Sequence, residues 1–165
     1  MIELKNITFS YEGREQGGLR NINLTVKNGE CILLCGRSGC GKTTVVCALL
    51  QAFCNRGLKA ASFKCGPDYI DPMFHQKVIG TPSRNLDLFF CGEDTVRYLF
   101  CRAAADAEIS VIEGVMGMYD GIGPDTQEAS SNHLAMVTKT PEILVIRACR
   151  EEGVEIGIVI GGGNI

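Results

Sequence analysis

This 165-residue chain has no long apolar run and no long run of basic residues. A membrane-spanning helix needs about 18 or more consecutive apolar residues, which no segment approaches. Glu3 and Lys5 interrupt the start of the chain, where a signal peptide would carry its apolar core. The net charge of −3 comes from acidic and basic residues spread along the sequence, which argues against a nucleic-acid backbone as partner. We therefore expect a cytoplasmic protein with no membrane span and no nucleic-acid partner.

Metal-binding motifs and a disulfide framework are also lacking, although the chain has nine cysteines. No CxxC pair occurs, and His75 and His133 stand isolated rather than at the spacing of zinc ligands. Cys47 and Cys54 lie on one predicted helix, where free cysteines are more often small core residues than ligands. We therefore expect neither a zinc site nor structural disulfides.

The composition that remains is typical of one globular domain. Hydrophobic residues make up 45% of the chain and charged residues 21%, which excludes a disordered scaffold. The length is enough to bury about two thirds of the unfolded surface, but it is too short for a second full domain.

Short strand patterns alternate with helical patterns along the chain. Alternating apolar residues over 2–9 and 21–27 predict an N-terminal antiparallel β-hairpin region. Apolar residues at helical spacing predict helices over 43–57, 96–104 and 131–138, and buried-strand patterns occupy 30–35, 60–64, 109–113, 143–146 and 154–160. This order is typical of an α/β fold with a mainly parallel sheet and helices on both faces.

The clearest motif is GRSGCGKT at 36–43, which fits the pattern GxxxxGK followed by Ser or Thr and lies between a predicted strand and a predicted helix. Glycines let backbone N–H groups turn toward phosphate oxygens, and the helix N-terminus adds a partial positive charge. Lys42 is expected to bridge the β- and γ-phosphates, and Thr43 to hold Mg²⁺. The sequence thus predicts a P-loop NTPase-type fold that binds ATP or GTP. The nucleotide-binding residues expected in this motif are Gly36, Ser38, Gly39, Gly41, Lys42, Thr43 and Thr44.

Glu113 ends a buried-strand pattern where the carboxyl edge of the sheet should meet the phosphate loop. A carboxylate at this place is the natural second partner of Mg²⁺, although a lone acid at a strand end is also common as a solvated or capping group. The glycines that follow, at 114, 117 and 121, permit close backbone approach to a ligand and equally suit a flexible loop.

A lysine and two carboxylates follow the predicted strand 60–64, in the sequence KCGPDYIDP at 64–72. Its two prolines predict a stiff loop, in which Lys64, Asp68 and Asp71 would neutralise a transferring phosphoryl group and hold a polar substrate. From the residue types alone a solvated turn is favoured, because Asp and Pro are common in turns.

Residues 1 to about 44 resemble the start of an ABC-transporter ATPase, in LKNITFSYEG, LRNINLTVKNGE and GRSGCGKTT. The resemblance implies that Tyr11 stacks on adenine. No LSGGQ signature, glutamine loop or switch histidine follows the phosphate loop. We therefore do not expect the machinery that pairs two such ATPases around ATP.

From about Gly41 to Ile146 the chain is similar to the synthetase domain of the cobyrinic acid a,c-diamide synthase family, which shares its fold with dethiobiotin synthetase. The motifs FKCGPDYIDPMFH, PSRNLD and VIEGVMGMYDG carry the resemblance, in this order. It implies that Lys64 contacts the γ-phosphate and that Glu113 is a magnesium ligand. It also ties Asp68 and Asp71 to the substrate carboxylate or its phosphorylated form, so the resemblance reverses the preference for a solvated turn. The catalytic candidates are then Lys42, Lys64, Asp68 and Asp71.

The resemblance implies ATP-dependent amidation of corrinoid acetate side chains through an acyl phosphate, with ATP and Mg²⁺ as cofactors. No nucleophilic cysteine on a strand-to-helix elbow is found, so ammonia or a separate glutaminase is the expected nitrogen source. A homodimer is left open. Two alternatives also stay open: a fragment of an ABC-transporter ATP-binding subunit, and a non-catalytic nucleotide-binding fragment.

These resemblances predict one P-loop α/β domain of mosaic origin over 1–165. Its parts are an ABC-like β region at 1–35, a nucleotide and substrate core at 36–146, and a tail at 147–165. The tail resembles a piece of uridylate kinase, whose glycine run binds nucleotide. We favour the simpler interpretation of one edge strand followed by a frayed end.

Overall fold

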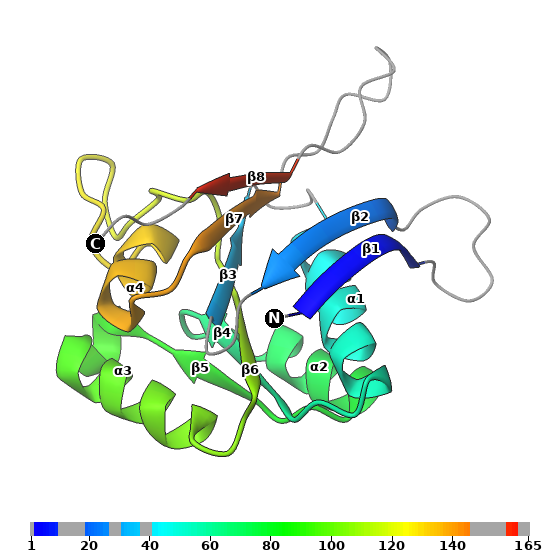
Figure 1. Cartoon of the computed structure of the whole chain (residues 1–165). Coiled ribbons are helices and arrows are strands. Elements are labelled where there is room, and N and C mark those ends of the chain that lie inside the picture. Colours follow the sequence, from blue (N-terminus) through cyan, green and yellow to red (C-terminus); the bar gives the residue numbers. More distant parts are fainter. Residues whose placement is uncertain (1, 10–18, 27–30, 37–40, 146–157, 162–165) are drawn as a thin grey trace, which may run out of the picture.

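The computed structural model describes residues 2–9, 19–26, 31–36, 41–145 and 158–161 (Figure 1). Among the described elements, strands and helices alternate from β3 to β7, as the sequence predicts. The elements in chain order are β1 (Ile2–Phe9), β2 (Leu19–Val26), β3 (Cys31–Cys35), α1 (Lys42–Asn55), β4 (Ala60–Cys65), α2 (Ile70–Ile79), β5 (Ser83–Leu86), α3 (Leu88–Ala104), β6 (Ile109–Glu113), α4 (Ser131–Thr138), β7 (Glu142–Val145) and β8 (Ile158–Gly161).

The described strands form a six-stranded sheet in the order β5-β4-β6-β3-β7-β8 and a separate pair, β1-β2. All neighbours in the larger sheet are parallel except β7 and β8, which are antiparallel. β1 and β2 pair antiparallel. The predicted mainly parallel sheet, the N-terminal hairpin region and an edge strand within the tail are therefore confirmed.

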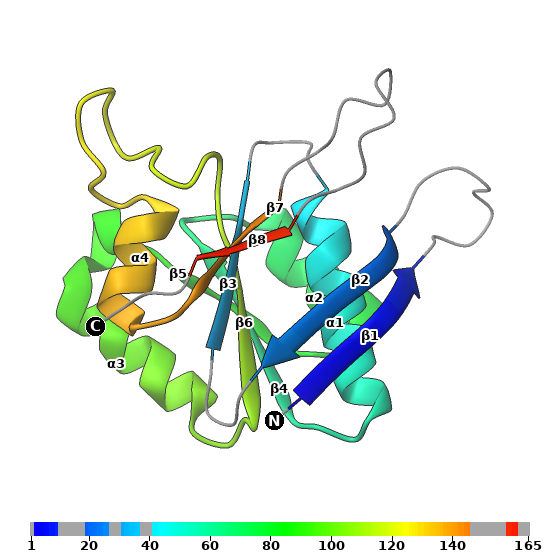
Figure 2. The same ribbon diagram turned by 45° about the horizontal axis from the view of Figure 1, so that its top comes forward.

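Helices cover both faces of this sheet, as Figure 2 shows, with α1 and α2 on one side and α3 and α4 on the other. Successive side chains of a strand point to opposite faces, and β3 follows this rule. Ile32 and Leu34 join a core with α1 and the β1-β2 hairpin, whereas Leu33 and Cys35 join a second core with α3 and α4. Residues far apart in the sequence pack together in these cores. In the second core, for example, the ring centroids of Phe63 and Phe100 are 5.1 Å apart.

Two elements near β4 are not among those predicted. The segment from Ile70 is the helix α2 rather than a stiff loop, so that prediction is wrong. Pro72 lies in its first turn, where a backbone N–H has no partner within the helix and a proline is tolerated. The four-residue strand β5 was missed, because it is short and has only one buried apolar side chain, Leu86.

The described cysteines form no disulfides with one another, and Cys47 is buried in α1 as a core residue. Among the described residues there is no group of three or more His, Cys, Asp or Glu that could hold a metal ion by themselves. No helix within these same residues has the length and apolar character needed to cross a membrane.

Candidate functional site

The candidate site lies at the carboxyl ends of β4, β6 and β3, which are adjacent in the sheet. Lys64 lies near the carboxyl end of β4, and Glu113 is the last residue of β6. The two are paired in the register of these neighbouring strands. The helix α1 begins with Lys42 and Thr43 directly after the phosphate loop that follows β3. The parallel arrangement therefore brings residues from three distant parts of the sequence to one edge.

Glu113 and Thr43 are in direct contact. The hydroxyl Oγ1 of Thr43 donates to Oε1 of Glu113 over 2.5 Å, and only 1% of Glu113 is exposed. Burial by itself would raise the pKa of Glu113, but His75, Lys64 and Thr43 outweigh it and hold this pKa below its usual value. Glu113 is therefore an ionised carboxylate, and an ionised carboxylate beside a hydroxyl is a donor set that suits a hard cation such as Mg²⁺.

The ammonium of Lys64 is surrounded by carboxyl groups. Its Nζ lies 2.8 Å from Oδ2 of Asp71, 3.7 Å from Oε1 of Glu113 and 3.8 Å from Oδ2 of Asp68, and it donates to the carbonyl oxygen of Gly114. Burial would lower the pKa of Lys64, but the nearby carboxylates outweigh it and raise this pKa. Three carboxyl groups thus face one ammonium, an excess of negative charge that a divalent cation would offset.

Asp68 and Asp71 reach Lys64 from the start of α2. Asp68 Oδ1 accepts from the backbone N–H of Ile70 at 2.8 Å and from that of Asp71 at 3.3 Å, so Asp68 also caps the helix. Burial would raise the pKa of Asp68, but these N–H groups and Lys64 outweigh it and lower this pKa. Asp68 therefore has a structural role that the sequence did not indicate, and Asp71 is the closer partner of Lys64.

Lys42, which follows the phosphate loop, hydrogen-bonds to two backbone carbonyl groups. Its Nζ donates to the carbonyl oxygens of Gly36 and Met116, the second at 3.2 Å. Gly41 has a φ of 98°, a left-handed backbone that favours glycine at the start of α1. Thr44 follows in the first turn, half-buried. The other predicted nucleotide contacts, Tyr11, Ser38 and Gly39, lie outside the described residues.

The glycines after Glu113 serve the packing of the chain itself. A Cβ on Gly114 would lie 2.7 Å from Oγ of Ser131 and 2.8 Å from the carbonyl oxygen of Leu34, so β3 and α4 require glycine there. The backbone of Gly117 donates to Oδ2 of Asp120 at 2.8 Å. At Gly114 the predicted close backbone approach is therefore made to neighbouring protein groups.

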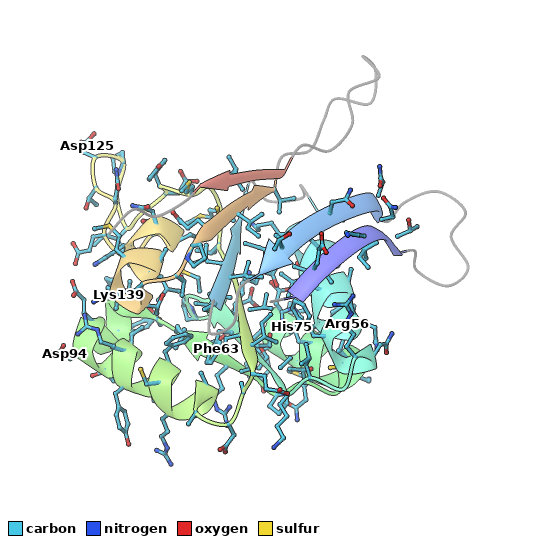
Figure 3. All side chains as sticks on the ribbon, viewed as in Figure 1. Arg56, Phe63, His75, Asp94, Asp125 and Lys139 are labelled. Atoms are coloured by element: carbon cyan, nitrogen blue, oxygen red, sulfur yellow. The ribbon has the colours of Figure 1, made fainter. Side chains whose placement is uncertain are left out.

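His75 is the residue of this site that the sequence analysis missed, because it was considered there only as a zinc ligand. It lies on α2 (Figure 3). Its side chain is fully buried, with Nε2 3.2 Å from Oε2 of Glu113. A spacing of four residues between Asp71 and His75 places both on one face of a helix, which would have revealed the link had α2 been recognised. His133 is also partnered, with Nε2 3.2 Å from Oε1 of Glu93.

A shallow cavity of about 240 Å³ adjoins these residues between α2 and β5. Asp68, Tyr69, Met73 and Asn85 are among the residues that line it. Tyr69 is 80% exposed and Met73 is 55% exposed, so apolar surface lies open next to the charged cluster.

The site can now be compared with known proteins. The chain is 50% identical to the cobyrinate a,c-diamide synthase of Clostridium acetobutylicum over 115 residues, which are 70% of this chain and 26% of that protein. It is 47% identical to the cobyrinate a,c-diamide synthase of Thermoplasma volcanium and 41% identical to the hydrogenobyrinate a,c-diamide synthase of Streptomyces coelicolor, each over 75% of this chain. Most of the chain is homologous to a,c-diamide synthases.

The matched segment is a large share of this chain but a small share of each relative. The chain spans about a quarter of the length of the a,c-diamide synthases it matches. The family model described as ABC transporter matches residues 19–57, which run from β2 through α1. The resemblances to a,c-diamide synthases and to ABC-transporter ATPases are therefore confirmed. The resemblance of the tail to uridylate kinase stays a prediction.

Solved structures establish the fold. The signal recognition particle receptor FtsY from Elizabethkingia anophelis in complex with GDP matches with a TM-score of 0.54 and 16% identity, covering 75% of this chain and 42% of that one. The 54 kDa signal recognition particle protein from Aeropyrum pernix in complex with GDP matches with a TM-score of 0.53 and 21% identity, covering 73% and 29%. The fold is that of P-loop NTPases, as predicted, and together with the phosphate-loop motif it indicates a nucleotide site.

Proposed function

We propose that the chain carries out ATP-dependent amidation of acetate side chains on a corrinoid. The observation that carries this proposal is the contact of Lys64 with Glu113, which joins a basic and an acidic side chain beside Thr43 at the start of α1. The relatives, named cobyrinate and hydrogenobyrinate a,c-diamide synthases, support the corrinoid as substrate.

The phosphate loop and α1 would hold the nucleotide. The ammonium of Lys42 now donates to the carbonyl groups of Gly36 and Met116. On nucleotide binding it would donate to phosphate oxygens instead. Thr43 and Glu113 fit Mg²⁺, because both present hard oxygen atoms and phosphate oxygens and water complete its coordination. When bound, Mg²⁺ would neutralise the charge that develops on the transferring phosphoryl group.

Lys64 would act at the far end of the triphosphate. Because its pKa is raised, it keeps its charge and can stabilise the γ-phosphoryl group during transfer. A carboxylate oxygen of the substrate attacks the γ-phosphorus, the bond to ADP breaks, and an acyl phosphate forms. Ammonia then attacks the carbonyl carbon, phosphate leaves, and the nitrogen loses a proton to give the amide. Asp68 and Asp71 contact Lys64 and would orient the reacting group of the substrate.

The cavity between α2 and β5 would take one side chain of the substrate. Its volume of about 240 Å³ lies below the roughly 300–1,000 Å³ of pockets that enclose a drug-sized ligand. An acetate arm with the adjoining ring edge fits this size better than a whole macrocycle does. The exposed Tyr69 and Met73 would contact the apolar ring. The nitrogen would come from free ammonia or a separate glutaminase, and we place the reaction in the cytoplasm, where ATP is available.

The test supplies the purified chain with ATP, Mg²⁺, cobyrinic acid and ammonium, and follows amide by mass spectrometry and ADP by a coupled assay. Amide and ADP are expected in equal amounts, because each amide consumes one acyl phosphate. In a parallel reaction, glutamine is not expected to replace ammonium. ADP without amide would contradict the ligase.

The ABC-transporter match over residues 19–57 favours a second candidate, a nucleotide-binding unit without amidation activity. Melting that shifts upward with Mg-ATP, combined with the absence of amide, would support nucleotide binding alone. Co-purification with a membrane permease would instead favour a transporter subunit.

A further inference from the structure

A line of polar side chains in close contact runs through the interior from β5 to Glu113. Oγ of Ser83 is 3.1 Å from Oγ of Ser62, and Oγ of Ser62 is 3.0 Å from Nδ1 of His75. On the other side of the imidazole, Nε2 lies 3.2 Å from Oε2 of Glu113. Ser62, His75 and Glu113 are each at most 1% exposed, so water does not replace these partners.

The proton positions along this line follow from what each group can donate. A carboxylate oxygen only accepts, so Nε2 of His75 must carry a proton to bind Oε2 of Glu113, 3.2 Å away. Nδ1, on the other side of the ring, lies 3.0 Å from the hydroxyl of Ser62, which is itself 3.1 Å from the hydroxyl of Ser83. Nε2 of His75 and Oε2 of Glu113 are buried and have no partner of hydrogen-bond geometry among the described residues, so their 3.2 Å contact is the polar interaction open to both.

The two oxygens of Glu113 therefore have different partners. Oε2 faces His75, while Oε1 accepts from Thr43 and lies 3.7 Å from Nζ of Lys64. A carboxylate held at one oxygen presents the other in a fixed direction, whereas a carboxylate without that contact can rotate. His75 stands one helical turn after Asp71 on α2, so a single helix contacts both Lys64 and Glu113.

We propose that His75 is a positioning residue, whose Nε2–H holds Oε2 of Glu113 so that Oε1 is presented to Thr43 and to the magnesium ion. The proposal rests on the proposed function of the site and goes beyond it by assigning a role to His75. His75 itself touches neither nucleotide nor metal. Its removal lowers the affinity for Mg²⁺ while leaving the contacts of the phosphate loop with nucleotide in place.

The test titrates Mg²⁺ into the full chain loaded with a fluorescent ATP analogue, and measures the affinity for the same analogue in EDTA. His75→Asn places an amide near Ser62 but is too short to reach Glu113, whereas His75→Gln places an amide N–H near the position of Nε2. We expect His75→Asn to weaken Mg²⁺ binding by about tenfold to a hundredfold, and His75→Gln to recover most of the loss. Affinity for the analogue in EDTA stays at the wild-type value in both variants.

His133→Asn is the matched control, since His133 is the other histidine of the chain and lies between α3 and α4, where it contacts Glu93. It is expected to bind Mg²⁺ as the wild type does. Equal losses in His75→Asn and His75→Gln, or wild-type affinity in a folded His75→Asn, would overturn the role of His75 alone. Absence of Mg²⁺ binding in the wild type would overturn the proposed function as well.

A second measurement does not depend on whether a variant folds. Because the chain has two histidines, ¹⁵N-labelled imidazole signals of the wild type can be assigned by comparison with His133→Asn. The proposal requires a proton on Nε2 of His75. An imidazole protonated on Nδ1 alone would leave Oε2 of Glu113 without its donor and would overturn the proposal.

Discussion

Lys64 and Glu113 are register partners on neighbouring parallel strands, with Nζ of Lys64 3.7 Å from Oε1 of Glu113. Each residue sets the charge of the other: the carboxylate raises the pKa of Lys64 against the effect of burial, and the ammonium helps to lower the pKa of Glu113. The pair therefore stays charged although both side chains are buried. Two opposite charges held at one edge of the sheet suit the phosphoryl transfer that we propose for this site.

Replacing Lys42 with alanine is expected to lower ATP-dependent phosphoryl transfer by about a hundredfold to a thousandfold, because one preorganised charge partner of the phosphates is removed. ADP release in the presence of substrate and ammonium measures this. Lys59→Ala, which removes an exposed lysine outside the site, serves as the control. Unchanged ATP turnover in Lys42→Ala would refute the assignment of the phosphate loop.

The two aspartates of α2 are expected to respond differently. Asp68→Ala removes the cap of the helix and should lower the free energy of unfolding by about 0.5–2 kcal/mol. Asp68→Asn should keep most of that stability, because asparagine caps helices about as well. Asp71→Asn should leave stability nearly unchanged and lower amide formation, since it weakens the closest contact of Lys64. Urea unfolding and product assays on the three variants separate the roles, and equal stabilities would contradict capping by Asp68.

Glu142 predicts a pH dependence of stability away from the candidate site. It is 9% exposed at the start of β7, its Oε1 has no hydrogen-bond partner among the described residues, and burial raises its pKa to about 7. The folded state then binds this proton more tightly than the unfolded state. Glu142 therefore favours folding below about pH 4.5, and this contribution is lost as the pH rises through about 7.

We expect Glu142→Gln to remove this loss of stability between about pH 5 and about pH 8. Free energies of unfolding in urea at the two pH values measure it, and Glu128→Gln, which changes an exposed carboxylate, is the control. The same pH dependence in wild type and Glu142→Gln would show that other groups cause it.

Gly114→Ala is expected to lower the free energy of unfolding by about 1–3 kcal/mol, because the new methyl group overlaps Oγ of Ser131 and the carbonyl oxygen of Leu34. Gly123→Ala is the matched control in the same loop, since its Cβ would lie 3.5 Å from Cγ2 of Thr126, an ordinary contact. Thermal melting compares the two. Equal melting temperatures for the two variants would contradict the close packing of Gly114 between β3 and α4.

Local patterns in the sequence were enough to predict most of the fold. The strands around Leu33 and Ile112 are short apolar runs, and α1 follows a glycine-rich loop, so neighbouring residues alone identify these elements. The helix α2 was missed because Pro72 and the two aspartates are typical of turns, whereas here Asp68 caps the helix and the proline lies in its first turn.

The charged residues of the candidate site could be predicted because parallel strands end at the same edge of a sheet. The contact of His75 with Glu113 was missed because α2, which places His75 one turn after Asp71, was interpreted as a loop. The roles of these residues stay predictions until the variants are measured.

The ammonium of Lys42 already has acceptors in the carbonyl groups of Gly36 and Met116. Under the proposed function, an incoming triphosphate would have to displace these internal acceptors, so its net binding free energy would be smaller than the strength of the new ionic contacts. In return, the lysine is ordered in advance and would lose little conformational freedom on binding.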